Sequence, residues 1–218
     1  MTFVRYVLTW FVVAIAIQSG SAADRILYTT DFSGFPVGED QLVGNVGWTG
    51  TNVGEAVHGI DEGLIEGLGK TAYLGSNIPM PATEFVTVDH SLTEPFTGMI
   101  QFQVLFGVNE STEGSNDIFG FDFLNEENEL MAALLFDTTL LDFGIWTDDS
   151  HETTATGGTF ITGLLNLLTV SIDLEANQWS ADLEGTPLFT DIPFTASTSE
   201  RTLASFGVAW QIADVEAP

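Results

Sequence analysis

The chain is 218 residues long, contains no cysteine, and carries 31 acidic against 4 basic residues, for a formal net charge of −27 at pH 7. A surface this acidic repels polyanions, which excludes nucleic acids as partners and disfavours sulfated or uronic-acid polymers. The lack of cysteine excludes disulfides, thiolate metal sites and a cysteine nucleophile, so the fold must depend on its hydrophobic core.

The first 23 residues have the pattern of a secretory signal peptide. Arg5 supplies a positive start, residues 6–17 an apolar core, and residues 21–23 a cleavage site made of small side chains. This apolar core is too short for a membrane span, which needs roughly 20 apolar residues. We therefore expect cleavage after Ala23, and an exported mature chain, secreted or on the cell surface, that begins at Asp24 and has no membrane span.

Short strands are predicted along the mature chain, and no repeat or low-complexity linker divides it. A first strand at 25–32 is followed by a glycine-rich stretch at 44–54, whose glycines suit tight turns and close strand contacts. Residues 56–60 and 71–75 are predicted to be two further short strands. We predict a single domain that spans residues 24–218.

From Phe85 onward the predicted strands become longer and alternate apolar with polar residues, as one buried and one exposed face requires. Residues 129–136 are ambiguous, because their Leu, Met and Ala favour a helix by propensity. Their position between two strands favours a buried strand, and we predict a strand. Residues 148–158 are predicted to be a loop. The other strands predicted in this half are 85–90, 99–106, 118–124, 141–147 and 203–212.

The clearest alternation lies in residues 167–194, which predict a β-hairpin that reverses at Ala176-Asn177. A slip of one residue would bury charged side chains, so the pattern determines which residues face the core. With no amphipathic helix in the mature chain, these strands indicate an all-β fold of two antiparallel sheets packed face to face. The predicted cross-strand pairs of the hairpin are Leu174–Trp179, Ile172–Ala181 and Val170–Leu183.

Six segments, in this order, carry a resemblance to a known family: 28–38, 47–50, 170–174, 179–185, 188–189 and 206–210. Together they look like exported bacterial concanavalin A-like (LamG-like) jelly-roll domains, of the kind that often carry a C-terminal sorting tail. The resemblance implies a jelly-roll β-sandwich that ends with one more strand, which would begin where this chain stops at Val215–Pro218; we expect that strand to be missing. It also implies a structural Ca²⁺ where the first strand meets the last, with Asp31 as the ligand we name.

Proteins that share this jelly roll include lectins, carbohydrate-binding modules, glucanases and alginate lyases, so the fold does not decide the function. The glucanases supply their two catalytic carboxyls from a strand with the pattern Glu-x-Asp-x-x-Glu, and residues 120–126 are the nearest match. With Asp122 as the central aspartate, Gly120 takes the place of the nucleophile and Leu124 or Asn125 that of the acid. Both catalytic positions are therefore lost.

Other catalytic arrangements find little support in the sequence. Lyases of this fold need Arg, Lys or His to neutralise a uronate carboxylate, and no such cluster is present. His58, His90 and His151 are too scattered to form a metal trio. Asp182 and Glu184 share one face of a strand, but on the exposed side of the hairpin, where carboxylates are ordinary surface groups.

Glycan binding is the function that the sequence leaves open. Trp146, Gln101, Gln103 and Asp122 lie opposite the more apolar faces of their strands, so we predict that they line an open, concave sheet and bind sugar. The alternative for Trp146 is a place in the core. Two functions follow: a non-catalytic exported module that binds neutral polysaccharide or cell-surface glycan, or serves as a surface or matrix component, and a divergent glycoside hydrolase that acts on neutral β-glucans.

Overall fold

The computed structural model describes residues 7–17, 25–54, 57–65, 67–75, 83–109, 117–147, 152–195 and 201–212. The expected cleavage site at Ala23, His151, and the chain end at 213–218 lie outside these ranges. No helix in the described part of the chain is long and apolar enough to cross a membrane.

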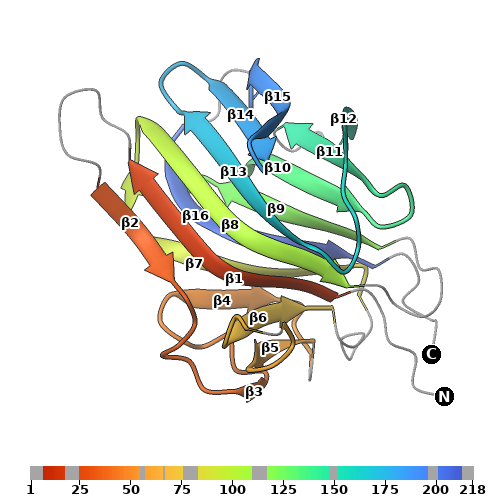
Figure 1. Cartoon of the computed structure of the whole chain (residues 1–218). Coiled ribbons are helices and arrows are strands. Elements are labelled where there is room, and N and C mark those ends of the chain that lie inside the picture. Colours follow the sequence, from red (N-terminus) through yellow and green to blue (C-terminus); the bar gives the residue numbers. More distant parts are fainter. Residues whose placement is uncertain are drawn as a thin grey trace.

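The described chain forms two antiparallel sheets that pack face to face (Figure 1), as the alternating strand patterns predict. Sheet A, the nine-stranded sheet, follows the order β15-β14-β13-β8-β1-β6-β5-β3, and β2 pairs with β1 beside this path. Its strands are β15 (Thr186–Ile192), β14 (Gln178–Leu183), β13 (Leu165–Asp173), β8 (Met99–Asn109), β1 (Val7–Ile17), β6 (Thr71–Leu74), β5 (His58–Asp61), β3 (Gly38–Glu39) and β2 (Arg25–Thr30).

Sheet B, the seven-stranded sheet, lies behind sheet A in Figure 1 and follows the order β12-β11-β10-β9-β16-β7-β4. Consecutive strands in this order are antiparallel. Its strands are β12 (Thr154–Thr159), β11 (Asp142–Thr147), β10 (Leu130–Asp137), β9 (Ile118–Leu124), β16 (Leu203–Gln211), β7 (Phe85–Phe96) and β4 (Trp48–Thr51).

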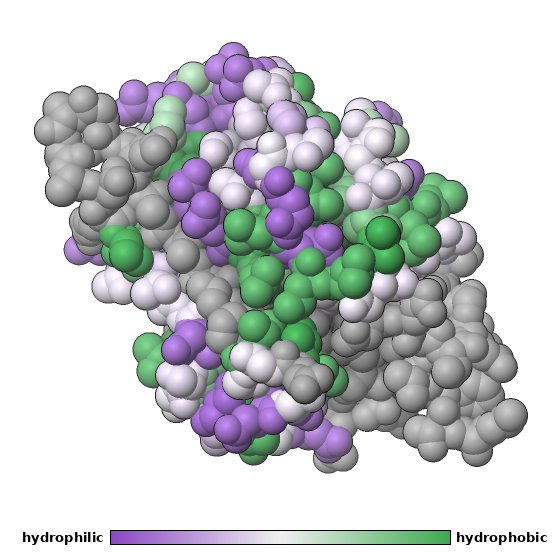
Figure 2. Space-filling model, in the orientation of Figure 1, coloured by the Kyte–Doolittle hydropathy of each residue, from purple (hydrophilic) through white to green (hydrophobic). Residues whose placement is uncertain are grey.

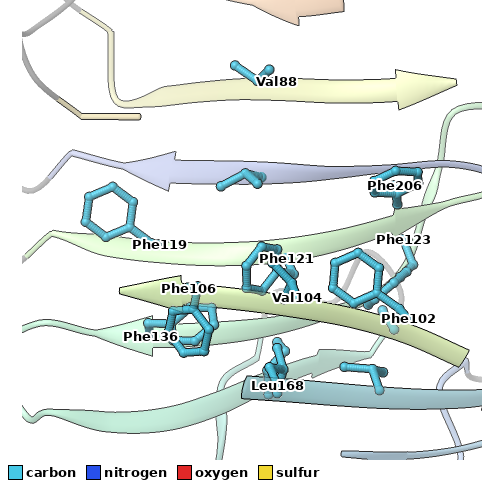
Figure 3. Close-up of a cluster of buried hydrophobic side chains, with 14 of the residues drawn as sticks. Val88, Phe102, Val104, Phe106, Phe119, Phe121, Phe123, Phe136, Leu168 and Phe206 are labelled. Atoms are coloured by element: carbon cyan, nitrogen blue, oxygen red, sulfur yellow. The ribbon is translucent and has the colours of Figure 1, made fainter. Parts of the chain in front are cut away.

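The core between the sheets is built mainly from phenylalanines at alternate strand positions. Phe102 and Phe106 of β8 meet Phe121 of β9, with ring centroids 5.5 and 5.9 Å apart (Figure 3). Phe136 of β10 packs on the same group, 4.8 Å from Phe106. Edge contacts of this kind let large rings fill the space between two sheets without voids. With no disulfide in the chain, this cluster is the principal source of stability.

Most predicted strands are present, including the ambiguous segment. Residues Leu130–Asp137 form strand β10, so the prediction of a strand over a helix is confirmed. Residues 148–158 were predicted as a loop, and this is wrong in part, because Thr154–Thr159 form strand β12. The sequence TATGGT has no apolar alternation; it is a strand because it pairs with β11 at the edge of sheet B. Local pattern cannot reveal pairing of this kind.

The predicted register of the hairpin is wrong by two residues, although its faces are right. Ile172 pairs with Trp179, Val170 with Ala181 and Leu168 with Leu183. The turn takes four residues, 174–177, because the Leu174 N–H donates to the Gly98 carbonyl (3.0 Å) and leaves the ladder. Asn177 adopts a positive φ of 56°, which asparagine tolerates better than most residues. A shift of two residues preserves the side-chain alternation, so the same residues remain buried.

Strand β1 comes from the apolar segment that the sequence predicts as part of a removable signal peptide. It pairs with β8 on one side, and with β6 and β2 on the other. In Figure 1 it runs through the middle of sheet A, between β8 and β2.

Candidate functional site

A row of register partners crosses the outer face of sheet B, the face turned away from the core. Asp89 of β7 pairs with Gly207 of β16, and Gly207 pairs with Asp122 of β9. Asp122 then pairs with Ala133 of β10, which pairs with Trp146 of β11. Directly paired residues share one face of a sheet. The structure therefore brings Asp122 and Trp146 to one face, as the sequence predicts.

Gly207 allows Asp89 and Asp122 to approach each other across the strand between them. A Cβ at this glycine would collide with Oδ1 of Asp89 and lie 3.0 Å from its Cγ. The Asp89 carboxyl therefore lies over the bare backbone of β16, on the side of Asp122. Two strands apart, the two Cα atoms are separated by about 10 Å, and the carboxyl of Asp89 spans part of that distance.

The Asp122 residue is half-buried, and one oxygen of its carboxyl lacks a protein donor. Its Oδ1 is enclosed and accepts no hydrogen bond. Burial, and then the charge of Asp89, raise the pKa of Asp122 to about 7. Burial also raises the pKa of Asp89 to about 6, against a hydrogen bond from the Thr87 hydroxyl (2.9 Å) that favours the charged form. Near neutral pH this pair can both donate and accept protons.

The surroundings of the pair toward β4 and β7 are open and rich in hydroxyl groups. Thr49, Thr51 and Ser91 are exposed. Thr49 lies opposite Asp89 in the ladder between β4 and β7, and Thr51 lies opposite Thr87. Small hydroxyl side chains and carboxyls on one sheet face give a surface that can exchange hydrogen bonds with a polar ligand.

Trp146 lies at the other end of the row and is largely enclosed. Its side chain is 9% exposed and packs with Ala133 and Leu135 in a small apolar cluster on the outer face. Its Nε1 donates to the Thr153 hydroxyl (2.8 Å). A ring held in this way offers little free surface for stacking against a sugar, so Trp146 borders the candidate site and does not form its platform.

Gln101 and Gln103 do not join this site, which corrects the prediction that the four residues line one sheet. Both lie on β8 in sheet A, opposite Ser171 and Thr169 of β13. Their side chains point to the outer face of sheet A, on the opposite side of the sandwich. That face is the one seen in Figure 2, where apolar residues form a patch between hydrophilic residues above and below. Period-two patterns assign a residue to the outside of a sheet but do not say which sheet.

Asp31 was predicted to hold a structural Ca²⁺, and its described surroundings do not fit one. Its side chain is exposed, and its Oδ1 accepts the Ser33 N–H at 2.9 Å. Hydrogen bonds from the Ser33 side chain and then from the Ser33 backbone lower its pKa. The nearby carbonyls of Ser33 and Phe35 already accept hydrogen bonds from the Lys70 ammonium, at 3.1 and 2.6 Å. Among the described residues no group of three or more His, Asp or Glu is arranged to hold a metal. Ca²⁺ needs 6–8 oxygen ligands, so calcium stays a prediction from the resemblance alone.

A buried histidine is another feature that the sequence did not reveal. His90 of β7 stacks between Tyr28 and Phe206, with ring centroids 3.8 and 5.4 Å away. The Trp48 indole N–H donates to the Tyr28 hydroxyl at 3.0 Å and closes the group. Burial lowers the pKa of His90 to about 4, so the ring is neutral. The only sign of this in the sequence is that His90 falls on the same alternating face of its strand as Val86 and Val88.

No protein-family model and no curated protein sequence matches the chain. Among solved structures, a sialidase superposes with a TM-score of 0.52 at 10% identity, over 78% of this chain and 14% of the sialidase chain. The carbohydrate-binding module CBM66 from Bacillus subtilis gives a TM-score of 0.48 at 10% identity, over 77% of this chain and 89% of the module. A tetrameric galectin from the ball sponge Cinachyrella sp. gives a TM-score of 0.39 at 8% identity, over 59% of this chain and 96% of the galectin chain.

The likeness to the sialidase shows the fold, a jelly-roll type of antiparallel β-sandwich, as the sequence predicts. The chain corresponds to a small part of the sialidase, 14% of its length. An identity this low transfers no activity.

Proposed function

We propose that this chain is an exported, non-catalytic module that binds a neutral glycan on the outer face of sheet B, around Asp89 and Asp122. The observation that carries the proposal is the Asp122 carboxyl, whose buried Oδ1 has no donor within the described protein. A buried acceptor without a partner is unfavourable by about 1–3 kcal/mol. The Asp122 residue as a whole is only half-buried, so a sugar hydroxyl that draws the carboxyl outward and donates to this oxygen would remove the penalty.

The charge of the chain restricts the ligand. A net charge of −27 repels acidic polymers, so a neutral polysaccharide or cell-surface glycan fits best. Export is part of the same proposal and is supported by the leader pattern of residues 1–23. N-terminal sequencing of the secreted protein tests it, with Asp24 expected as the first residue.

Binding is tested with a panel of neutral polysaccharides by affinity electrophoresis, and by calorimetry with oligosaccharides of the best ligand. We expect Asp122→Asn to weaken binding at least about tenfold, the equivalent of one lost hydrogen bond to a charged group. Gln103→Ala, on the opposite face, is the matched control and should bind as the wild type does. Loss of binding in the control alone would move the site to sheet A. No binding at millimolar ligand would leave only a role as a surface or matrix component.

A divergent glycoside hydrolase is the second candidate, and the coupled carboxyls favour it. Glycosidases need one carboxyl that is protonated near the working pH and one that is ionised. Asp89 and Asp122, with pKa values of about 6 and 7, provide such a pair from two strands that the Glu-x-Asp-x-x-Glu motif does not include. One carboxyl would protonate the leaving oxygen while the other accepts the proton of the attacking water.

Hydrolysis is tested by the release of reducing ends from neutral β-glucans across pH 4–9. Activity that follows a bell-shaped pH profile and disappears in both Asp89→Asn and Asp122→Asn would establish the hydrolase. Inertness toward all substrates, combined with binding, would reject it in favour of the binding module.

A further inference from the structure

Strand β1 raises a structural problem for an exported chain. Its residues, Val7–Ile17, belong to the segment that we propose is removed on export, and yet they form an interior strand of sheet A. On one side, β1 pairs with β8 from Ile100 to Asn109. On the other side, it pairs first with β6 and then with β2. Removal of the leader would take a strand out of the middle of the sheet.

The neighbours of β1 define what its place in the sheet can accept. At the level of Leu8, the register partners are Val108 on β8 and Leu74 on β6, and both are fully buried. At the level of Ile15, the partner on β8 is Phe102, which is 1% exposed. The core-facing positions of an occupant must therefore be apolar at every second residue, with one extra residue where β1 shifts register between Trp10 and Val13.

The opposite face of the same place is more tolerant. The register partners of Ala14 and Ala16 on β8 are Gln103 and Gln101. Gln103 is exposed and Gln101 is half-buried. Polar residues at these two positions of an occupant would remain in contact with water.

Without an occupant, sheet A would be divided. Strands β8 and β6 stand two strand spacings apart across β1, about 9.5 Å, which is too far for backbone hydrogen bonds between them. The N–H and C=O groups along one edge of β8 would lose their partners, and the cover over Phe102 and Val104 would be opened. A long apolar edge of this kind pairs readily with another strand.

We propose that, once the leader has been removed, the place of β1 is an acceptor site for an extended segment of a partner polypeptide, added antiparallel to β8. The partner segment has apolar side chains at alternate positions, those opposite Val108, Phe106, Val104, Phe102 and Ile100. Its backbone completes the ladder with β8 on one side and with β6 and β2 on the other. The leader itself, seated in this register, shows the length and pattern that fit.

The proposal rests on removal of the leader and not on glycan binding. The test uses the full chain with a specific protease site introduced in the connection 18–24, so that the protein folds before the leader is cut. After cleavage, a fluorescent peptide with the sequence of residues 7–17, flanked by lysines for solubility, is added. We expect the peptide to exchange into the nicked protein, with an increase in anisotropy that saturates at one peptide per chain.

Two peptide variants make the test specific for the register. An Ile15→Asp peptide places a charge opposite Phe102, and should lose at least about a hundredfold in affinity. An Ala14→Asp peptide carries the same charge one residue away, opposite the exposed Gln103, and should bind within a few-fold of the parent. Equal binding of both variants would overturn the proposal, because uptake would then be unspecific.

Three other results would also overturn it. An exported protein that still carries residues 1–17 would show that the place is never vacated. A nicked protein that releases the leader, remains monomeric and keeps its melting temperature without peptide would show that the sheet closes on itself. A nicked protein that dimerises and takes up no peptide would make a second copy of the chain the occupant.

Discussion

Asp122→Asn is the substitution whose effect the structure defines most sharply. The change keeps the shape of the side chain but removes its charge. In the folded protein the pKa of Asp122 is raised to about 7 from the ordinary 3.8, because the carboxyl is buried beside Asp89. Between pH 3.8 and about pH 7, the Asp122 carboxyl therefore keeps its proton in the folded state, whereas in the unfolded state it has already lost it.

The direction in which stability changes with pH follows from the difference between the folded and unfolded pKa values of Asp122. A carboxyl whose folded pKa is raised contributes no penalty below about pH 4, and destabilises the fold progressively as the pH rises toward 7. The shift from 3.8 to about 7 corresponds to about 4 kcal/mol at pH 8, taking 1.36 kcal/mol for each pH unit. We expect Asp122→Asn to match the wild type at pH 4 and to be about 2–4 kcal/mol more stable at pH 8, since local relaxation reduces the full value.

The assay is urea denaturation followed by tryptophan fluorescence, at intervals from pH 4 to pH 8. For a domain of this size a gain of 1 kcal/mol raises the melting temperature by roughly 2–4 °C, so thermal scans should show a shift of about 10 °C at pH 8. Glu126→Gln is the matched control, because it removes one negative charge from an exposed turn. It corrects for the general repulsion of a chain with a net charge of −27.

The reasoning is refuted if the stability difference between Asp122→Asn and the wild type does not change with pH. It is also refuted if Glu126→Gln gives the same pH-dependent gain, because the effect would then come from net charge and not from burial. A gain in stability accompanied by a loss of glycan binding would connect the penalty to function.

Three further predictions concern other parts of the molecule. His90→Phe keeps an aromatic ring between Tyr28 and Phe206 but removes a group whose pKa is lowered to about 4 by burial. Below pH 6.5 the variant should become more stable than the wild type. Urea titrations should show a gain of up to about 3 kcal/mol at pH 4. Gly207→Ala places a methyl group against the Asp89 carboxyl and 2.8 Å from the Val88 carbonyl, and should lower stability by about 1–3 kcal/mol, whereas Gly34→Ala, with nothing within 4 Å, should be neutral. Addition of a chelator should leave the melting temperature unchanged, because the Lys70 ammonium already donates to the Ser33 and Phe35 carbonyls near Asp31; a decrease that added Ca²⁺ reverses would show a structural calcium ion.

The strand content and the assignment of faces could be predicted because both depend on local alternation. Phe119, Phe121 and Phe123 face the core while Gly120 and Asp122 face outward, as their alternation indicates. The register of the hairpin was not predictable to the same degree. A turn of two residues and a turn of four give the same faces, and the choice depended on the bond from Leu174 to Gly98, in a different part of the chain.

The candidate site could be predicted only in part, because its members come from strands far apart in sequence. Asp122 and Trp146 were assigned to an outer face correctly, since each lies opposite apolar neighbours on its own strand. Asp89 was missed, because its proximity to Asp122 depends on β16, from the end of the chain, lying between β7 and β9. Gly207 is the residue that permits this proximity, and a lone glycine in a strand indicates only that something approaches closely.

His90 and Asp122 are two buried groups with opposite effects on stability. His90 lies on β7 and Asp122 on β9, with β16 between the two strands. His90 destabilises the fold as the pH falls below 6.5, whereas Asp122 destabilises it as the pH rises above 4. Between these limits the slopes of His90 and Asp122 have opposite signs, so the wild-type curve partly conceals both, and the raised pKa of Asp89, about 6, adds to the slope of Asp122. Only the difference curves of His90→Phe and Asp122→Asn separate them. Because an asparagine would avoid the penalty at Asp122 while keeping its shape, stability does not explain the presence of this ionisable carboxyl. Its contribution should be sought in binding or proton transfer.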